Sequence, residues 1–147
     1  MIQDNQTNMV YLAHGLSHYV SVCGNLLEAL HREHIHAEFL PYTSFYKQVW
    51  VRDYMPIQLE KSLFFFYEYW PDYLLGYDGY IPNVLEIIDH LHLGRIPVNY
   101  VLDGGNIVKC GDKVIMTDKI FQENGWMERK GLLSTLEDYL QVQIIII

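Results

Sequence analysis

The sequence contains little cysteine, little positive charge and no long apolar run. Its two cysteines, Cys23 and Cys110, are too few for the disulfide framework of a small secreted protein. Ten lysines and arginines stand against 18 aspartates and glutamates, and the formal charge of −8 would repel a nucleic-acid phosphate backbone. No apolar stretch approaches the length that crosses a bilayer. We therefore expect no nucleic acid and no membrane as a partner.

The N-terminal residues lack the pattern of a secretory signal as well. Residues 1–6, MIQDNQ, contain no basic segment followed by an apolar one. Together with the small number of cysteines, this predicts a cytoplasmic protein. The negative charge of the chain is compatible with a small cationic ligand.

The chain does contain enough apolar and aromatic residues for one globular domain. Half of its 147 residues are hydrophobic, and aromatic residues, among them 12 tyrosines, make up 14%. A domain of this length buries roughly 70% of the surface that its unfolded chain exposes. Tyrosine and tryptophan suit half-buried surfaces such as a lined pocket or an interface. Residues 1–147 are therefore expected to form a single domain.

Apolar residues recur at helical spacing in three segments. These are residues 17–32, a segment that begins at Asn83, and residues 130–140. Asn83 is a favourable N-cap with Glu86 three residues later, and Gly94 followed by Pro97 is typical of a helix end. The second helix is therefore predicted to stop at Gly94.

Short apolar runs between these helices predict strands. Strands are expected at 9–13, 37–40, 98–102 and 142–147, and hairpins pair 57–59 with 63–67 and 107–109 with 114–117. A unit of helix, strand, polar acidic segment and hairpin thus starts at residue 17 and again at residue 83. A third copy starts at residue 130. Weak repetition of such units indicates a radial or stacked architecture.

The sequence ends inside a strand pattern, QVQIIII, at residues 141–147. Four consecutive isoleucines suit a strand that is covered on both faces. One interpretation is a C-terminal strand at the centre of a sheet. The other, which we favour, is that the chain is truncated and the natural protein continues beyond Ile147.

The densest cluster of polar and aromatic residues is WVRDYMP, residues 50–56. A planar cation can donate two hydrogen bonds to the carboxylate of Asp53 and stack on the ring of Trp50. Arg52 is either an internal counter-ion or a contact for a ligand carboxylate. The structural alternative is an Arg–Asp pair at a strand end, among aromatic residues of the core.

A second polar segment, LDGGN at residues 102–106, follows a predicted strand. Its paired glycines allow a tight turn or the close approach of a ligand. The alternative is a simple turn in which Asp103 and Asn106 form hydrogen bonds with their own backbone.

In this order and at this spacing, the two segments resemble the bacterial peptidylarginine deiminase and agmatine deiminase family. The match includes residues 67–70 and the second hairpin, so it covers most of the chain. These enzymes belong to the guanidine-modifying superfamily, whose α/β fold is the pentein fold, a five-bladed propeller of ββαβ units. The resemblance implies a partial pentein domain over residues 1–147, about half of the five-fold arrangement.

The resemblance also implies guanidine hydrolysis, with no cofactor and no metal. In this family a cysteine thiolate attacks the guanidinium carbon, ammonia leaves, and water releases the covalent intermediate as a ureido product, while a histidine acts as general acid and base. Matching positions of the motifs imply substrate-binding roles. Asp53 would bind the guanidinium and Trp50 would line the pocket, and Asp103 stands where agmatine-type relatives have Glu. Arg52 and Asn106 complete the candidate site.

The chain departs from the family pattern at several positions. Met55 occupies a position that is usually Gly, and Gln48 stands where relatives often have Asp. The His-x-Asp segment and the nucleophilic Cys of the family are expected beyond Ile147, so no catalytic residue is expected in this chain. Cys23, on an apolar helix face, and Cys110, beside an acid in a hairpin turn, are not substitutes.

Seven histidines raise the alternative of a metal site. On a strand, His34 and His36 would share a face, and one more ligand would complete such a site. His90 and His92 do not converge on a helix. A solvated helix end is the simpler interpretation, and we expect no metal.

The leading hypothesis is the N-terminal part of a guanidine-hydrolysing deiminase that acts on agmatine or peptidyl-arginine. The alternative is a catalytically inactive pentein-fold domain that binds a ligand or oligomerises. The expected partner is a small guanidino compound or peptidyl-arginine. A homo-oligomer is compatible with either hypothesis.

Overall fold

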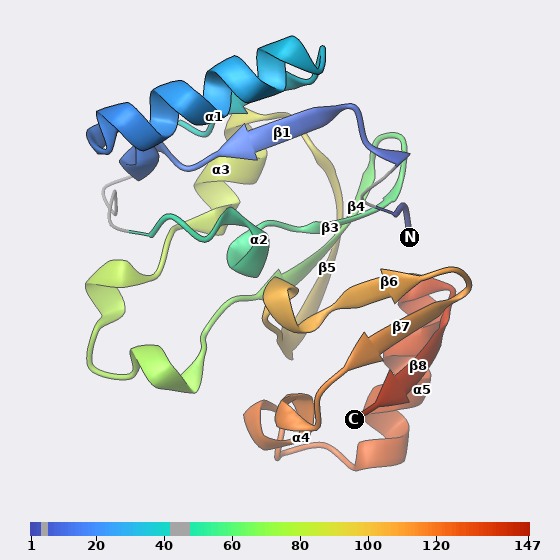
Figure 1. The fold of residues 1–147 in the computed structure, drawn as a ribbon. Helices are drawn as coiled ribbons and strands as arrows, with labels where there is room; N and C mark the ends of the chain where they lie inside the picture. Colours follow the sequence, from blue (N-terminus) through green and yellow to red (C-terminus); the bar gives the residue numbers. More distant parts are fainter. Residues whose placement is uncertain (4–5, 42–47) are drawn as a thin grey trace.

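A computed structural model describes residues 1–3, 6–41 and 48–147 of the chain. These residues contain three small sheets that follow one another in chain order, from the blue to the red end of the ribbon (Figure 1). None of their helices is long and apolar enough to span a bilayer.

The first sheet pairs β1 (Met9–Leu12) with β2 (His36–Phe39) in parallel. The connection runs through the 3₁₀ helix η2 (His14–His18) and the α-helix α1 (Val20–Arg32). The helix predicted from residue 17 therefore begins at Val20, because the residues before it wind into the tighter 3₁₀ helix.

The second sheet has the order β3-β4-β5. The antiparallel hairpin of β3 (Ile57–Glu60) and β4 (Leu63–Glu68) confirms the predicted pairing. The chain then passes through α3 (Val84–His90) and returns as β5 (Gly94–Val101), parallel to β4. The Asn83 side chain accepts a hydrogen bond from the Glu86 amide, which confirms the predicted cap of α3.

The end of α3 differs from the prediction. The helix stops at His90, and His92 takes the left-handed conformation with φ of +52°. Gly94 instead begins β5, and Pro97 lies inside that strand. A proline is tolerated there because, among the described residues, β5 pairs with β4 alone, and a residue at the open edge of a sheet need not donate a backbone hydrogen bond.

The third sheet repeats the second, with the order β6-β7-β8. β6 (Val108–Cys110) and β7 (Lys113–Met116) form the second predicted hairpin, and β8 (Gln143–Ile146) lies parallel to β7. Between them the chain forms α4 (Lys119–Glu123), which was not predicted, and α5 (Arg129–Leu140). Two successive units therefore share the ββαβ topology, as expected from the sequence repeat.

The position of β8 differs from the expectation of a strand at the centre of a sheet with both faces covered. It pairs with β7 alone, so it lies at an edge of the described sheet. Its residues alternate between exposed and half-buried, and the Ile145 side chain is 38% exposed. Alternation of this kind is typical of a strand with one covered face.

A single core connects the second and third units. Fully buried residues come from both sheets and their helices, including Phe65, Ile88, Val114 and Leu136. The segment between β4 and α3 contributes Tyr69 to this core and contains two short 3₁₀ helices, η3 (Asp72–Leu74) and η4 (Asp78–Tyr80). Exposed aromatic rings cluster in it, among them Tyr73 and Tyr77.

Candidate functional site

The two polar motifs occupy equivalent places in successive units. The first forms the short helix α2 (Val51–Tyr54), directly before the β3–β4 hairpin, and the second forms the 3₁₀ helix η5 (Gly104–Asn106), directly before the β6–β7 hairpin. The two short helices contact each other. Segments far apart in sequence are thereby brought together, as the resemblance implied. The polar residues of the first motif lie on a helix, not at a strand end.

Arg52 joins α2 to the second motif. Its guanidinium donates from Nε to the backbone carbonyl of Gly104 at 3.1 Å, and from Nη2 to the carbonyl of Ile107 at 2.8 Å. Charged donors form the stronger class of hydrogen bonds. These two bonds bracket η5, so they fix its position relative to α2.

The hydroxyl of Tyr67 reinforces this arrangement from within the core. Tyr67 is fully buried on β4, and its hydroxyl lies 2.8 Å from the backbone carbonyl of Asp53 and 3.1 Å from that of Met55. Burial raises the pKa of Tyr67, so the hydroxyl stays protonated and donates. The chain that follows the Asp53 side chain is therefore fixed to β4 through Tyr67.

The paired glycines are required by the contact between the two motifs. A Cβ at Gly104 would collide with the carbonyl oxygen of Arg52 and the hydroxyl of Tyr67, and a Cβ at Gly105 would lie 2.5 Å from Oδ1 of Asp53. The two glycines therefore allow the close approach of α2 to η5. The Asp103 carboxylate also accepts a hydrogen bond from the Gly105 amide at 2.9 Å, as the simple-turn interpretation expected.

The close approach brings two carboxyl groups against each other. Burial raises the pKa of Asp53 from 3.8 to about 6, and the charge of Asp103 and a hydrogen bond between the two carboxyl groups add to the rise. The positive charges of Lys119 and Arg52 oppose it. We call Asp53 and Asp103 the acidic pair. Two carboxyl groups in this arrangement hold a proton, or a cation that takes its place.

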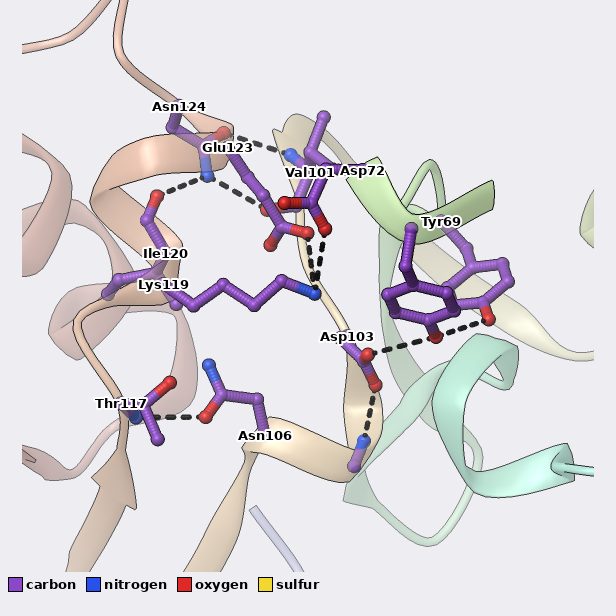
Figure 2. A network of polar contacts seen from close by, with 12 residues as sticks. Tyr69, Asp72, Val101, Asp103, Asn106, Thr117, Lys119, Ile120, Glu123 and Asn124 are labelled. Atoms are coloured by element: carbon purple, nitrogen blue, oxygen red, sulfur yellow. Dashed lines mark hydrogen bonds and ion pairs between the residues drawn. The ribbon is translucent and has the colours of Figure 1, made fainter. Parts of the chain in front are cut away.

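Tyrosine hydroxyls extend the hydrogen-bonding network from Asp103 (Figure 2). Tyr73 donates to Oδ2 of Asp103 at 3.3 Å, and the hydroxyls of Tyr73 and Tyr69 lie 3.0 Å apart. The side-chain amide of Gln48 in turn donates to Tyr69 at 3.3 Å. Gln48, one of the departures from the family pattern, is thus connected to the acidic pair through two tyrosines.

Lys119 is the main site residue that the sequence interpretation missed. Its ammonium lies 3.1 Å from Oε1 of Glu123 and 3.4 Å from Oδ1 of Asp72, and 4.7 Å from the ring centroid of Tyr73. Burial opposes its charge, but the ion pairs with Glu123 and Asp72 outweigh burial and raise the pKa of Lys119. Burial also raises the pKa of Glu123, against the effect of Lys119. The spacing of Lys119 and Glu123, one helical turn apart, was the signal available in the sequence.

The remaining predicted residues lie around the pair. Asn106 belongs to η5, and its Oδ1 accepts from the Thr117 amide at 2.8 Å, while its Nδ2 is buried and donates to none of the described residues. Trp50 precedes α2, and its side chain is 68% exposed. The other predicted residues therefore meet at the contact of α2 with η5, whereas the Trp50 ring stands at the surface.

A cavity of about 660 Å³ borders the joined motifs. Arg52 and Gly104 line it together with residues of β1 and β3, but neither member of the acidic pair does. The acidic pair is thus separate from this cavity.

The cysteines and histidines lie elsewhere. Cys23 is buried on α1, as predicted, and Cys110 is exposed at the end of β6. His34 precedes β2 with φ of +57°, so it does not share a strand face with His36. Across residues 1–3, 6–41 and 48–147, no three His, Cys, Asp or Glu side chains are grouped so that they would hold a metal ion.

The model of the Porphyromonas-type peptidyl-arginine deiminase family matches residues 1–147. The chain belongs to this family. A search of curated proteins finds no match.

Solved structures show the same fold in more distant proteins. The C. jejuni agmatine deiminase has a TM-score of 0.70 at 13% identity, over 95% of this chain and 52% of its own. An agmatine deiminase of Enterococcus faecalis has a TM-score of 0.61 at 16% identity, over 95% of this chain and 50% of its own. A DDAH from Pseudomonas aeruginosa, solved with citrulline, has a TM-score of 0.60 at 13% identity, over 95% of this chain and 60% of its own. These matches confirm the pentein-type α/β fold, and this chain spans about half the length of the agmatine deiminases.

Proposed function

We propose that this chain provides part of the guanidinium pocket of a guanidine-hydrolysing deiminase, in which the acidic pair binds the guanidinium. The observation that carries the proposal is the close approach of α2 to η5, where burial and then the neighbouring charge of Asp103 raise the pKa of Asp53 to about 6. A guanidinium placed between two carboxylates donates hydrogen bonds to both and removes their mutual repulsion. It would therefore displace the proton that the pair otherwise holds.

The other predicted residues have supporting roles in this proposal. Arg52 is a positioning residue, because two donors of its guanidinium are bonded to the backbone around η5. The exposed ring of Trp50 supplies a face for a planar cation at the surface end of α2. Asn106 fixes the end of η5 through Thr117.

We further propose that the reacting thiol and the general acid–base come from outside this chain. The two cysteines lie in α1 and at the β6–β7 turn, away from the contact of α2 with η5. The proposed reaction breaks one C–N bond of the guanidinium and forms a C–O bond with water, releasing ammonia and leaving a ureido group. The substrate is agmatine or peptidyl-arginine, and a cytoplasmic location is part of this proposal.

Calorimetric titration of agmatine into the 147-residue chain tests the pocket. Because the chain supplies only part of it, we expect a dissociation constant on the order of 1 mM. Asp53→Asn and Asp103→Asn should each lower the affinity about tenfold, since each removes a charge-assisted hydrogen-bond acceptor. Asp112→Asn, in an exposed turn, is the matched control and should leave binding unchanged. Equal binding by all three variants would contradict the assignment.

Assay of the full natural protein separates this proposal from the inactive-domain alternative. A deiminase forms a ureido product and ammonia from agmatine or a peptidyl-arginine. A binding or oligomerising domain retains affinity for the guanidinium and forms neither product.

A further inference from the structure

Lys119 occupies a cation-binding position of its own beside the acidic pair. Two carboxylates lie within ion-pairing distance of its ammonium, at 3.1 Å from Glu123 and 3.4 Å from Asp72, and the Tyr73 ring lies below it at 4.7 Å. Carboxylates and an aromatic face are the groups that recognise an ammonium ion. We call these three residues the lysine cage.

The lysine cage and the acidic pair share one residue. The Tyr73 hydroxyl donates to Asp103 at 3.3 Å, while the ring of the same tyrosine faces the Lys119 ammonium. Figure 2 shows the Lys119 side chain reaching from α4 toward Asp72 and Glu123, and the Asp103 carboxylate turned toward the tyrosine hydroxyls. The Lys119 charge also acts on Asp53, where it opposes the rise in pKa that burial and Asp103 cause. A ligand held by the acidic pair is therefore close to this ammonium.

Lys119 is held firmly in the lysine cage. The Glu123 side chain is only 4% exposed, so its carboxylate would be costly to leave without a cation. The next residue, Asn124, is fully buried and ties α4 to β5 through hydrogen bonds with both backbone groups of Val101. A second cation would therefore have to displace an ammonium that is anchored on a fixed helix.

We propose that Lys119 is a specificity-determining residue, which makes the site select guanidines whose remaining part is uncharged or anionic over guanidines with a second cation. This inference rests on the proposed function of the acidic pair. By occupying the lysine cage, Lys119 excludes a second ammonium, and its charge offsets the repulsion that Asp72 and Glu123 would exert on a ligand carboxylate. Among the proposed substrates, it favours an arginine side chain over agmatine.

Three ligands that differ only in the tail test the inference. They are agmatine, with an ammonium tail, butylguanidine, with an apolar tail, and N-acetyl-arginine, with a carboxylate. Dissociation constants are measured by calorimetry for the wild-type chain and for Lys119→Gln. We expect the preference for butylguanidine over agmatine to shrink about fivefold in K119Q, since one partly exposed ionic interaction is exchanged. In the same variant, the affinity for N-acetyl-arginine should fall relative to the affinity for butylguanidine.

Two matched variants separate the charge from the side chain. Lys119→Arg keeps the charge and should keep the wild-type order of the three ligands. Lys130→Gln removes an exposed lysine of α5 and should also keep it. Lys119→Met retains the apolar part of the side chain and should reproduce the result of K119Q, so the inference stays testable if the glutamine variant unfolds.

The outcomes distinguish the two proposals. Unchanged ligand ratios in K119Q and K119M would overturn the role of Lys119 and leave the acidic pair as the guanidinium site. Wild-type protein that binds none of the three ligands would overturn the proposed function and this inference together. Tighter agmatine binding in K119Q with unchanged butylguanidine binding would support both.

Discussion

The Arg52 side chain donates a hydrogen bond to the backbone carbonyl of Gly104, 52 positions further along the chain, at 3.1 Å. With its second bond, to Ile107, this residue connects two ββαβ units at the point where each unit contributes an acid. The guanidinium of Arg52 thus binds backbone carbonyls of the protein and fixes η5 against α2.

Arg52→Lys should therefore destabilise the fold and weaken guanidinium binding. A lysine cannot make both bonds in the same geometry, and the loss should cost about 1–2 kcal/mol in the free energy of unfolding. Urea denaturation measures this change. Arg32→Lys, at the exposed end of α1, is the control and should shift the midpoint very little. An equal shift in both variants would mean that the bonds of Arg52 do not hold η5 in place.

Alanine substitutions at the two glycines of η5 should differ in effect, because one should mainly lower stability and the other mainly lower ligand affinity. Gly104→Ala places a methyl group against the Arg52 backbone and should destabilise the fold by about 3 kcal/mol, as overpacking does. Gly105→Ala meets the movable Asp53 carboxylate at 2.5 Å, so it should lower agmatine affinity more than stability.

Gly24→Ala is the control for this pair. A Cβ at this position of α1 has no neighbour within 4 Å, and a helix gains about 0.5–1 kcal/mol from the change. Thermal and urea denaturation compare the three variants. If Gly104→Ala were as stable as Gly24→Ala, the close contact of α2 with η5 would be disproved.

The acidic pair predicts a specific dependence of stability on pH. Folding raises the pKa of Asp53 from 3.8 to about 6, so between these values the folded protein holds a proton that the unfolded chain has released. The free energy of unfolding contributed by this group therefore falls as the pH rises through that window. Asp53→Asn should flatten this part of the stability profile, measured by urea denaturation at closely spaced pH values. An unaltered slope would show that Asp53 titrates normally.

The same proton should leave when a guanidinium binds. Near pH 6 the pair holds a proton that the ligand displaces, so agmatine affinity should rise with pH and binding should release protons. Calorimetry in two buffers of different ionisation enthalpy measures the release. In Asp103→Asn the neighbouring charge is absent, so the remaining binding should release fewer protons. Equal release in both proteins would contradict a shared proton.

Much of the fold could be predicted because its signals are local. The hairpin pairings, the Asn83 cap and the three predicted helices depend on residues close in sequence, and the structure confirms them. The end of α3 was wrong because a histidine, not Gly94, adopts the left-handed conformation there. The exposure of β8 depends on which strands lie beside it, which periodicity does not specify.

The candidate site was less predictable, because its contacts join residues that are far apart in the sequence. The two motifs pointed to Asp53 and Asp103, but the contact of the two carboxyl groups results from packing between units. Lys119 was missed because α4 is too short to show helical periodicity, and its partner Asp72 comes from a separate segment. The contacts of Lys119 with Asp72 and of Asp53 with Asp103 are long-range, and no local pattern encodes them.

Asn124 provides a final test, because it links the helix of Lys119 to the strand that leads into the second motif. It is fully buried, its Oδ1 accepts from the Val101 amide at 2.9 Å, and its Nδ2 donates to the carbonyls of Val101 and Ile120, both at 2.8 Å. Asn124→Ala removes all three bonds and leaves buried backbone groups unpaired, so it should cost about 2–4 kcal/mol in the free energy of unfolding. Asn99→Ala, exposed on the same strand, should cost far less. Because the lysine cage depends on the position of α4, Asn124→Ala should also reduce the preference for butylguanidine over agmatine under conditions where the variant remains folded. A variant that loses stability but keeps the wild-type preference would show that the cage is positioned without Asn124.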